Sequence, residues 1–238
     1  MKVLSVDFVS RVFPNGFKAL DNVSFSVNKG ECLVIAGSNG SGKTVLMNII
    51  AGLEESSSGS AALSADEKAG LIFQDADAQI LGETVEEDIS FGPRNAGLSK
   101  KEIQEKTEEA AIKTGLDKRK EFPARLLSGG EKRRLAVAGV LALDCSIIIF
   151  DEPYANLDWP GVRQVNEIIK QLKEEGKTVI ILTHELEKIL ALADRFLVLH
   201  CGKIVYDGVP DEGVKQNLGE WGIRNPLSVY KTLKDLVW

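Results

Sequence analysis

Residues 37–44 read Gly37-Ser38-Asn39-Gly40-Ser41-Gly42-Lys43-Thr44, which fits the pattern GxxxxGK[S/T]. Glycines let backbone N–H groups converge on phosphate oxygens, and the positive end of a following helix attracts an anion. The Lys43 ammonium suits β- and γ-phosphates, and the Thr44 hydroxyl can ligate Mg²⁺. About 0.02 chance matches are expected in a shuffled chain of this composition. The stretch therefore predicts a nucleotide-binding loop.

The residues around this loop place it between a strand and a helix. Glu31 to Ala36 is an apolar run typical of a buried strand, and a helical stretch to about Ala51 follows the loop. Downstream, apolar runs alternate with helical patterns, which favours a parallel α/β sheet. Further strands are expected at 71–73, 147–150 and 178–182, with a β-like pair around 196–206, and helices at 129–143, about 160–175 and about 185–193.

The N-terminal part and a charged middle block differ from this alternation. Short β-like runs at 3–9 and 23–27 flank the turn signal Pro14-Asn15-Gly16. Ser56 to Ser60 is rich in Ser and Gly and predicts a connector. Residues 84–121 predict a helical unit rich in Glu and Lys, broken at Gly92-Pro93 and at Gly97. Most of its charges are expected to form a solvated helix face.

Composition narrows the class of protein. The chain has 238 residues, with 29 Lys and Arg against 35 Asp and Glu, and its net charge of −6 argues against a general nucleic-acid binder. The longest nearly uncharged stretch, Leu135 to Leu143, is far shorter than the roughly 20 residues of a membrane-spanning helix. Residues 1–7 show no apolar signal core, and the three cysteines form no CxxC pair. We therefore expect a soluble cytosolic protein without disulfides.

A second glycine-rich element opens the helix expected at 129–143. Leu127-Ser128-Gly129-Gly130-Glu131 contains the S-x-x-E pattern of a capping box, so it can be read as a well-capped helix start and no more. Two adjacent glycines, however, weaken a helix and expose its positive end, which suits an anion. Since Lys43's loop already holds a γ-phosphate from one side, we expect Ser128, Gly129 and Gly130 to grip a nucleotide held by another copy.

Two carboxylates follow the apolar strand at 147–150. Asp151 and Glu152 precede Pro153 and fall beyond the carboxyl end of a parallel strand, where ligands of such sheets bind. Asp151 is placed to hold the Mg²⁺ shell, and Glu152 to position or deprotonate the attacking water. A lone Asp-Glu-Pro is more often a solvated strand exit, but its place downstream of the phosphate loop favours the catalytic interpretation.

These motifs together resemble the nucleotide-binding subunit of an ATP-binding cassette (ABC) transporter over nearly the whole chain. Gly37–Thr44 resembles the Walker A loop, Leu127–Glu131 the ABC signature, and Ile147–Glu152 the Walker B strand with its catalytic glutamate. Ala155–Asp158 is similar to the D-loop, with Asn156 where a smaller residue is usual. The resemblance also assigns single residues: Gln74 as the Q-loop glutamine near Mg²⁺, Glu131 within the signature, Asp158 in the D-loop, His184 as the switch histidine and Phe13 as the aromatic platform for adenine.

The single residues have plainer alternatives. Gln74 alone would more often be a surface glutamine, and a strand-end histidine such as His184 is often only a satisfied polar residue. Phe13, before a turn, could pack into the core. The order of the motifs favours the functional interpretation of each: Gln74 as a sensor of nucleotide state, His184 as a γ-phosphate contact and Phe13 as the adenine stack.

The family resemblance implies a fold and a division of the chain. The expected fold class is α/β, a P-loop NTPase (RecA-like) parallel-sheet core with an N-terminal antiparallel β-subdomain and an inserted α-helical subdomain. Within a single domain, residues 1–83 and 144–206 would form the β-subdomain and core. Residues from about 84 to 143 would form the helical subdomain with the signature, and residues 207–238 a C-terminal tail for packing or subunit contact.

Residues 71–98 and 132–141 resemble the ATPases of energy-coupling-factor importers, which take up vitamins, cobalt or nickel ions. Ala76, where proline is usual, and a short segment between Gly59 and Gly70 depart from that pattern. The resemblance implies an ATP-hydrolysing subunit that works as a homodimer or with a paralogue. Its partners would be an integral membrane coupling protein and a substrate-capture membrane protein at the cytoplasmic face of the membrane. The cargo and the choice of dimer partner stay open.

Proteins of other functions share part of these motifs. An ATPase of another ABC transporter class shares every motif of the site. A soluble ABC protein of DNA repair or translation usually carries two cassettes or a long coiled-coil insertion, and neither is found here. A P-loop kinase or GTPase gives no reason for the signature or the D-loop.

Overall fold

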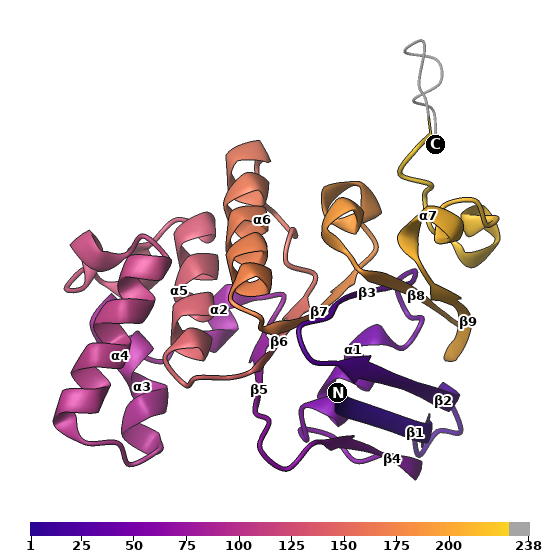
Figure 1. The fold of residues 1–238 in the computed structure, drawn as a ribbon, viewed down its shortest axis with the longest axis horizontal. Helices are drawn as coiled ribbons and strands as arrows, with labels where there is room; N and C mark the ends of the chain where they lie inside the picture. Colours follow the sequence, from indigo (N-terminus) through magenta and orange to yellow (C-terminus); the bar gives the residue numbers. More distant parts are fainter. Residues whose placement is uncertain (229–238) are drawn as a thin grey trace.

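The computed structural model describes residues 1–228 and contains two sheets, shown in Figure 1. A six-stranded sheet has the order β5-β6-β7-β3-β8-β9, and its strands are β3 (Cys32–Ala36), β5 (Ala69–Ile72), β6 (Ile147–Asp151), β7 (Thr178–Thr183), β8 (Arg195–His200) and β9 (Lys203–Gly208). All neighbours in this sheet are parallel except β8 and β9, which pair antiparallel. The predicted parallel α/β sheet is therefore confirmed, with an antiparallel edge.

A three-stranded antiparallel sheet forms the N-terminal part. Its order is β2-β1-β4, and its strands are β1 (Lys2–Val12), β2 (Lys18–Asn28) and β4 (Ser58–Leu63). The predicted turn at 14–16 joins β1 to β2, and both strands extend beyond the predicted runs. The connector predicted at Ser56–Ser60 is wrong, because most of that stretch belongs to edge strand β4.

Helices cover both faces of the large sheet, and its strands are therefore buried on both sides. Alternate residues of one strand, such as Leu33 and Val34, enter two separate hydrophobic clusters. One cluster joins the sheet to the antiparallel sheet and to helix α1 (Lys43–Ile50). The other joins it to α5 (Gly129–Leu141) and α6 (Trp159–Glu174). The large sheet is thus the rigid platform from which the loops after its strands project.

A helical unit lies to one side of the large sheet, at the left in Figure 1. It consists of α3 (Val85–Asn95), α4 (Lys100–Lys113) and α5, which pack around a hydrophobic cluster of their own. The break predicted at Gly92-Pro93 is wrong, because α3 continues through both residues. A Cβ at Gly92 would lie 2.8 Å from Leu143 Cγ, so this glycine permits close packing instead. The break at Gly97 is confirmed.

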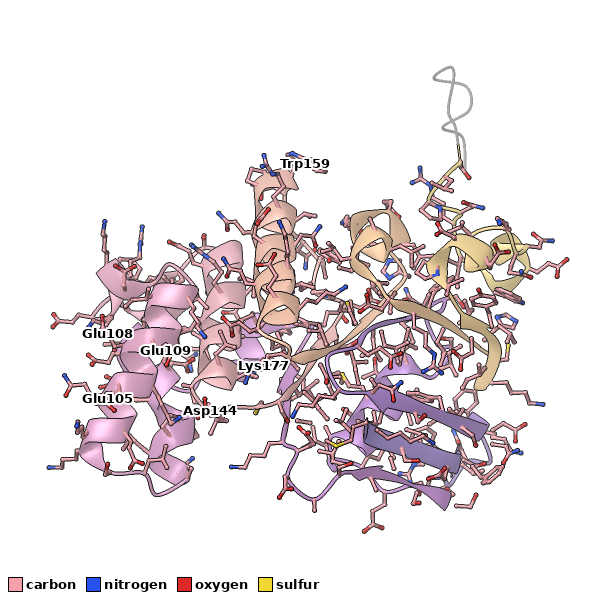
Figure 2. All side chains as sticks on the ribbon, viewed as in Figure 1. Glu105, Glu108, Glu109, Asp144, Trp159 and Lys177 are labelled. Atoms are coloured by element: carbon pink, nitrogen blue, oxygen red, sulfur yellow. The ribbon has the colours of Figure 1, made fainter. Side chains whose placement is uncertain are left out.

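The charged face of this unit is solvated, as the Glu and Lys runs predict. Figure 2 shows Glu105 and Glu108 along the outer side of α4, whereas Glu109 lies on the side toward Asp144 and Lys177, with which it lines a small hollow. Glu105 pairs with Lys101 at 3.7 Å and Glu109 with Lys113 at 3.2 Å, both at i,i+4 spacing on the exposed helix. Exposed pairs of this kind contribute only a few tenths of a kcal/mol each, about 0.3–0.5 kcal/mol.

The short elements complete the chain. The α2 turn (Ala76–Gln79) precedes the helical unit, and α7 (Pro210–Gly213) follows β9. The helix predicted at about 185–193 is wrong, because two 3₁₀ turns, Leu186–Lys188 and Leu190–Leu192, occupy that stretch. In the predicted tail, Trp221 packs partly buried against the core, whereas Trp238 lies outside the described residues. Within residues 1–228 no helix is both long and apolar enough to cross a membrane.

Candidate functional site

The phosphate loop lies between β3 and α1, as its sequence predicts. Gly42 caps α1 with a φ of 106°, a region that side chains rarely adopt, and a Cβ there would lie 2.5 Å from the Ala19 carbonyl. Only glycine fits this turn, which leaves the first N–H groups of α1 free to face an anion. Lys43 is the first residue of α1 and is 6% exposed.

Lys43 is held over the loop. Its Nζ donates to the Gly37 carbonyl at 2.7 Å and to the Ser38 carbonyl at 3.3 Å. The same ammonium lies 3.5 Å from Glu152 Oε1, with both side chains buried. A phosphate entering this loop would meet a fixed cation whose present partners are two carbonyls and one carboxylate.

Asp151 and Glu152 close the site from the end of β6. Thr44 Oγ1 donates to Asp151 Oδ2 at 3.4 Å, which brings the two predicted metal ligands together. The other Asp151 oxygen, Oδ1, is buried and has no hydrogen-bond partner among the described residues. Burial, and then the neighbouring Glu152, raise the pKa of Asp151. A carboxylate oxygen without a partner beside a hydroxyl is a donor set that suits Mg²⁺.

Glu152 is fixed by His184, the residue after β7. His184 Nδ1 lies 3.0 Å from Glu152 Oε1, and the His184 backbone N–H donates to Oε2 at 3.3 Å. Glu152 itself adopts a φ of 43°, a strained conformation for a side-chain-bearing residue. Its backbone N–H donates to the Leu182 carbonyl at 2.8 Å, so adjacent strands β6 and β7 hold this turn. Two other predicted site residues, Lys43 and His184, therefore both contact the carboxylate of Glu152.

A hollow of about 220 Å³ opens beside these groups. Phe13 and Gln74 both line it, together with the loop and Glu152. The sequence analysis missed Phe17, which is 56% exposed, lines the same hollow and stacks near Phe13 with ring centroids 6.3 Å apart. The sequence does place a second aromatic residue, Phe17, just after the turn that follows Phe13. Only the fold, however, shows that both aromatic rings line the hollow at the phosphate loop.

The signature segment forms a different hollow. Ser128 caps α5: its hydroxyl accepts from Glu131 N–H at 3.4 Å and donates to Glu131 Oε2 at 2.8 Å. The Ser128 backbone N–H also donates to Glu131 Oε2 at 2.9 Å, and this bond, with that of the hydroxyl to the same carboxylate, lowers the pKa of Glu131. The hollow measures about 500 Å³ and is lined by Ser128–Glu131, by the D-loop and by the start of α6. Among residues 1–228, none lines both this hollow and the one at the phosphate loop.

Asp158, predicted as a D-loop residue, is the N-cap of α6. Its Oδ1 accepts from the Gly161 N–H at 2.9 Å, so it is a helix cap as well as a predicted site residue. Asn156 adopts a φ of 59°, in the left-handed region that glycine and asparagine tolerate best. Asparagine at this position, where the family usually has a smaller residue, therefore suits the left-handed backbone.

The fold and the loop define this chain as a P-loop nucleotide-binding protein. The sequence model described as ABC transporter matches residues 20–155, which is more than half of the chain. The chain belongs to this family, and the prediction of an ABC-type ATPase is confirmed.

Individual relatives agree with the family match. The chain is 35% identical to the cobalt import ATP-binding protein CbiO of Rhodobacter capsulatus, over 95% of this chain and 86% of that protein. It is 38% identical to the energy-coupling factor transporter ATP-binding protein EcfA of Carboxydothermus hydrogenoformans, over 95% of this chain and 88% of that protein. The solved structure of cbiO1 from Clostridium perfringens, part of the ABC transporter complex cbiONQ, is similar with a TM-score of 0.82 and 31% identity. The region that the two structures share covers 90% of this chain and 91% of the cbiO1 chain.

Proposed function

We propose that this chain is the ATP-hydrolysing subunit of a membrane importer of the energy-coupling-factor type, with vitamins, cobalt or nickel ions as the candidate cargo. The family and the relatives named for cobalt import and energy coupling support this assignment. The substrate-capture and membrane coupling proteins would be separate chains, and this subunit would act at the cytoplasmic face of the membrane.

The observation that carries the mechanism is the separation of the two hollows. Each is built at the N-terminus of a helix and suits an anion, and they share no lining residue within the described chain. A third hollow of about 460 Å³ adjoins both, since Gln74 lines it together with Gly129, Asn156 and Leu157. We infer that ATP is held between the phosphate loop of one chain and Ser128, Gly129 and Gly130 of a second. Two-fold symmetry would then give two equivalent sites in a homodimer.

The roles of the residues at the phosphate loop follow from their chemistry. Residues Gly37–Thr44 would bind the phosphates, and Phe13 with Phe17 would stack on adenine. Thr44, Asp151 and Gln74 would hold Mg²⁺, which neutralises phosphate charge when bound. Glu152 would orient or deprotonate the attacking water, and His184, which already holds Glu152, would contact the γ-phosphate.

ATP would act as a bridge between the two chains. With its γ-phosphate in place, both half-sites are occupied and the dimer is closed, and hydrolysis removes the bridge and opens it. Gln74 would report the nucleotide state to the membrane partner. We also propose the division of the chain into three parts: a β-subdomain with core at 1–83 and 144–206, a helical subdomain at about 84–143 and a C-terminal tail at 207–238. The helical subdomain would offer a groove to the membrane protein.

Affinity purification of the full chain from its native membranes tests the transport assignment. We expect integral membrane proteins to co-purify and Mg²⁺-dependent ATP hydrolysis to need no nucleic acid. Strong stimulation by DNA or RNA, without any membrane partner, would instead favour a soluble ABC protein. Phosphoryl transfer to a small acceptor instead of water would favour a kinase.

A further inference from the structure

Arg133 is a buried cation near the start of α5. It is 4% exposed, and charged side chains are seldom buried to this extent unless they are paired. Within residues 1–228 no carboxylate forms an ion pair with it; its hydrogen-bond partners are backbone carbonyls. Such a costly burial needs an explanation beyond the packing of α5.

The guanidinium of Arg133 holds the segment that contains Gln74. Its Nη1 donates to the Phe73 carbonyl at 2.6 Å, and its Nη2 donates to the Gln74 carbonyl at 2.8 Å. Two bonds from one planar group fix the orientation of the peptide as well as its position, which a lysine cannot do. Burial lowers the pKa of Arg133, and the nearby carboxylates of Asp75 and Asp151 oppose this shift.

The same segment is fixed from its other side. Gln79 Oε1 accepts from the Phe73 N–H at 3.0 Å, and Gln79 Nε2 donates to the Leu71 carbonyl at 2.9 Å. Next to Arg133, Lys132 pairs with Asp77 at 2.5 Å, although Asp77 is largely exposed. The peptide at Phe73 therefore has its N–H and its carbonyl both bound by side chains, and it cannot move relative to α5 unless the Arg133 bonds break.

This contact joins the two half-sites of one chain. Gln74 lines the hollow at the phosphate loop, and α5 begins with the signature residues that line the other hollow. We propose that Arg133 is a positioning residue that couples the ATP site of its own chain to the site that this chain completes for a second copy. The inference rests on the proposed function, because only a dimer gives each chain two nucleotides to connect.

Cooperativity is the consequence that separates coupling from a merely structural contact. In the dimer, each ATP would touch Gln74 of one chain and the signature of the other, so two Arg133 contacts would link both sites. Binding at one site would then set the position of the signature at the second. A residue that only stabilises the fold would change the unfolding midpoint and leave the cooperativity of hydrolysis unchanged.

The test compares Arg133→Met, Arg133→Lys and a control, Arg195→Lys, in the full chain. Arg195 also donates to a backbone carbonyl, that of Ser26 at 2.7 Å, but it lies on β8 away from both hollows. We expect Arg133→Met to bind a fluorescent ATP analogue within about twofold of wild type, because the phosphate loop is untouched. Its Hill slope for ATP hydrolysis should fall from about 2 to about 1, with Arg133→Lys between them and Arg195→Lys at the wild-type value.

Hydrogen exchange of the nucleotide-free chain gives a second readout. We expect the amides of residues 73–79 to exchange about tenfold faster in Arg133→Met, with no change in the control. A folded Arg133→Met chain with the wild-type Hill slope and exchange overturns the proposal, and so does an equal loss of cooperativity in Arg195→Lys. A wild-type chain that neither hydrolyses ATP nor dimerises overturns the proposed function itself, before any variant is compared.

Discussion

At the scale of single residues, the site depends on a few side chains held in costly conformations. Asp151 is buried with one oxygen that has no hydrogen-bond partner within residues 1–228, and Glu152 and Asn156 both have positive φ. Such features reduce the stability of the nucleotide-free chain and persist because the surrounding strands and helices hold them. Asp151 and Glu152, which we propose act on Mg²⁺ and on the attacking water, are therefore also residues whose replacement can stabilise the fold.

Replacing Asp151 with Asn should stabilise the nucleotide-free chain at neutral pH. Burial and Glu152 raise the pKa of Asp151 above its ordinary 3.8, so its ionised form destabilises the folded state at neutral pH. As the pH falls through the raised pKa towards 3.8, the folded wild type gains the proton and the advantage of the variant disappears. Urea unfolding at several pH values measures this.

The same variant should lose Mg²⁺-dependent ATP hydrolysis, since a neutral amide is a weak ligand for this ion. An Asp151→Asn chain that is less stable than wild type at neutral pH would show that the ionised carboxylate stabilises the fold, contrary to this expectation.

Asn156 offers a test of backbone conformation. Its side chain is exposed and its φ is 59°, so Asn156→Gly should keep the stability of the chain. Asn156→Val should lower the free energy of unfolding by about 1–2 kcal/mol, because a β-branched residue is strained in the left-handed region. Equilibrium unfolding in urea compares the two. Equal stability of both variants would mean that the loop relaxes out of this conformation.

At the scale of elements, helix N-termini carry both stability and function. The helices α4 and α5 begin alike, with a serine and a glutamate that form a capping box: Ser99 with Glu102, and Ser128 with Glu131. Only the second of these caps lies in the signature hollow. The two serines are therefore a matched pair in which stability and nucleotide contact can be separated.

Ser99→Ala and Ser128→Ala should each cost about 1 kcal/mol of unfolding free energy, because each removes the hydroxyl that accepts from an N3 amide. Only Ser128→Ala should also reduce ATP hydrolysis, since only that hydroxyl would touch the nucleotide of a second chain. Thermal unfolding and steady-state hydrolysis give the two quantities. A similar loss of hydrolysis in both variants would assign the effect to stability alone.

The elements also show where sequence patterns stop being informative. Strands β3, β6 and β7 are continuous apolar runs and were predicted nearly to the residue. Edge strand β4 was missed because its residues are small except for Leu63 and are largely exposed. Gly59 lies so close to the Asp7 and Phe8 carbonyls that no Cβ would fit. The pairing partner of β4 is about fifty residues away in sequence, so only the fold reveals it.

Some residues at and near the site could be predicted from the sequence and others could not. Lys43, Asp151 and Glu152 stand in local motifs whose chemistry is specific, so the sequence predicts their neighbourhood. The contacts of Arg133 join segments that are 59 and 60 residues apart, and a basic run at a helix start usually predicts a solvated face. Long-range contacts to backbone carbonyls leave no pattern in the sequence.

At the scale of the whole molecule, we propose that one chain supplies two halves of different ATP sites. The hollow at the phosphate loop and the hollow at the signature segment share no lining residue within the described chain. We therefore propose that ATP joins two copies of the chain and that hydrolysis at Glu152 separates them. A variant that binds ATP without hydrolysing it should stop the cycle in the joined state.

The most direct test is the mass of Glu152→Gln in solution with saturating ATP and Mg²⁺, measured by gel filtration with light scattering. Losing the carboxylate should slow hydrolysis by about 10²–10⁴-fold. We expect a species of twice 25.9 kDa with ATP and the single-chain mass without nucleotide. The control Lys43→Ala/Glu152→Gln should stay monomeric in both conditions. If Glu152→Gln binds ATP but remains at the single-chain mass, the composite ATP site is contradicted.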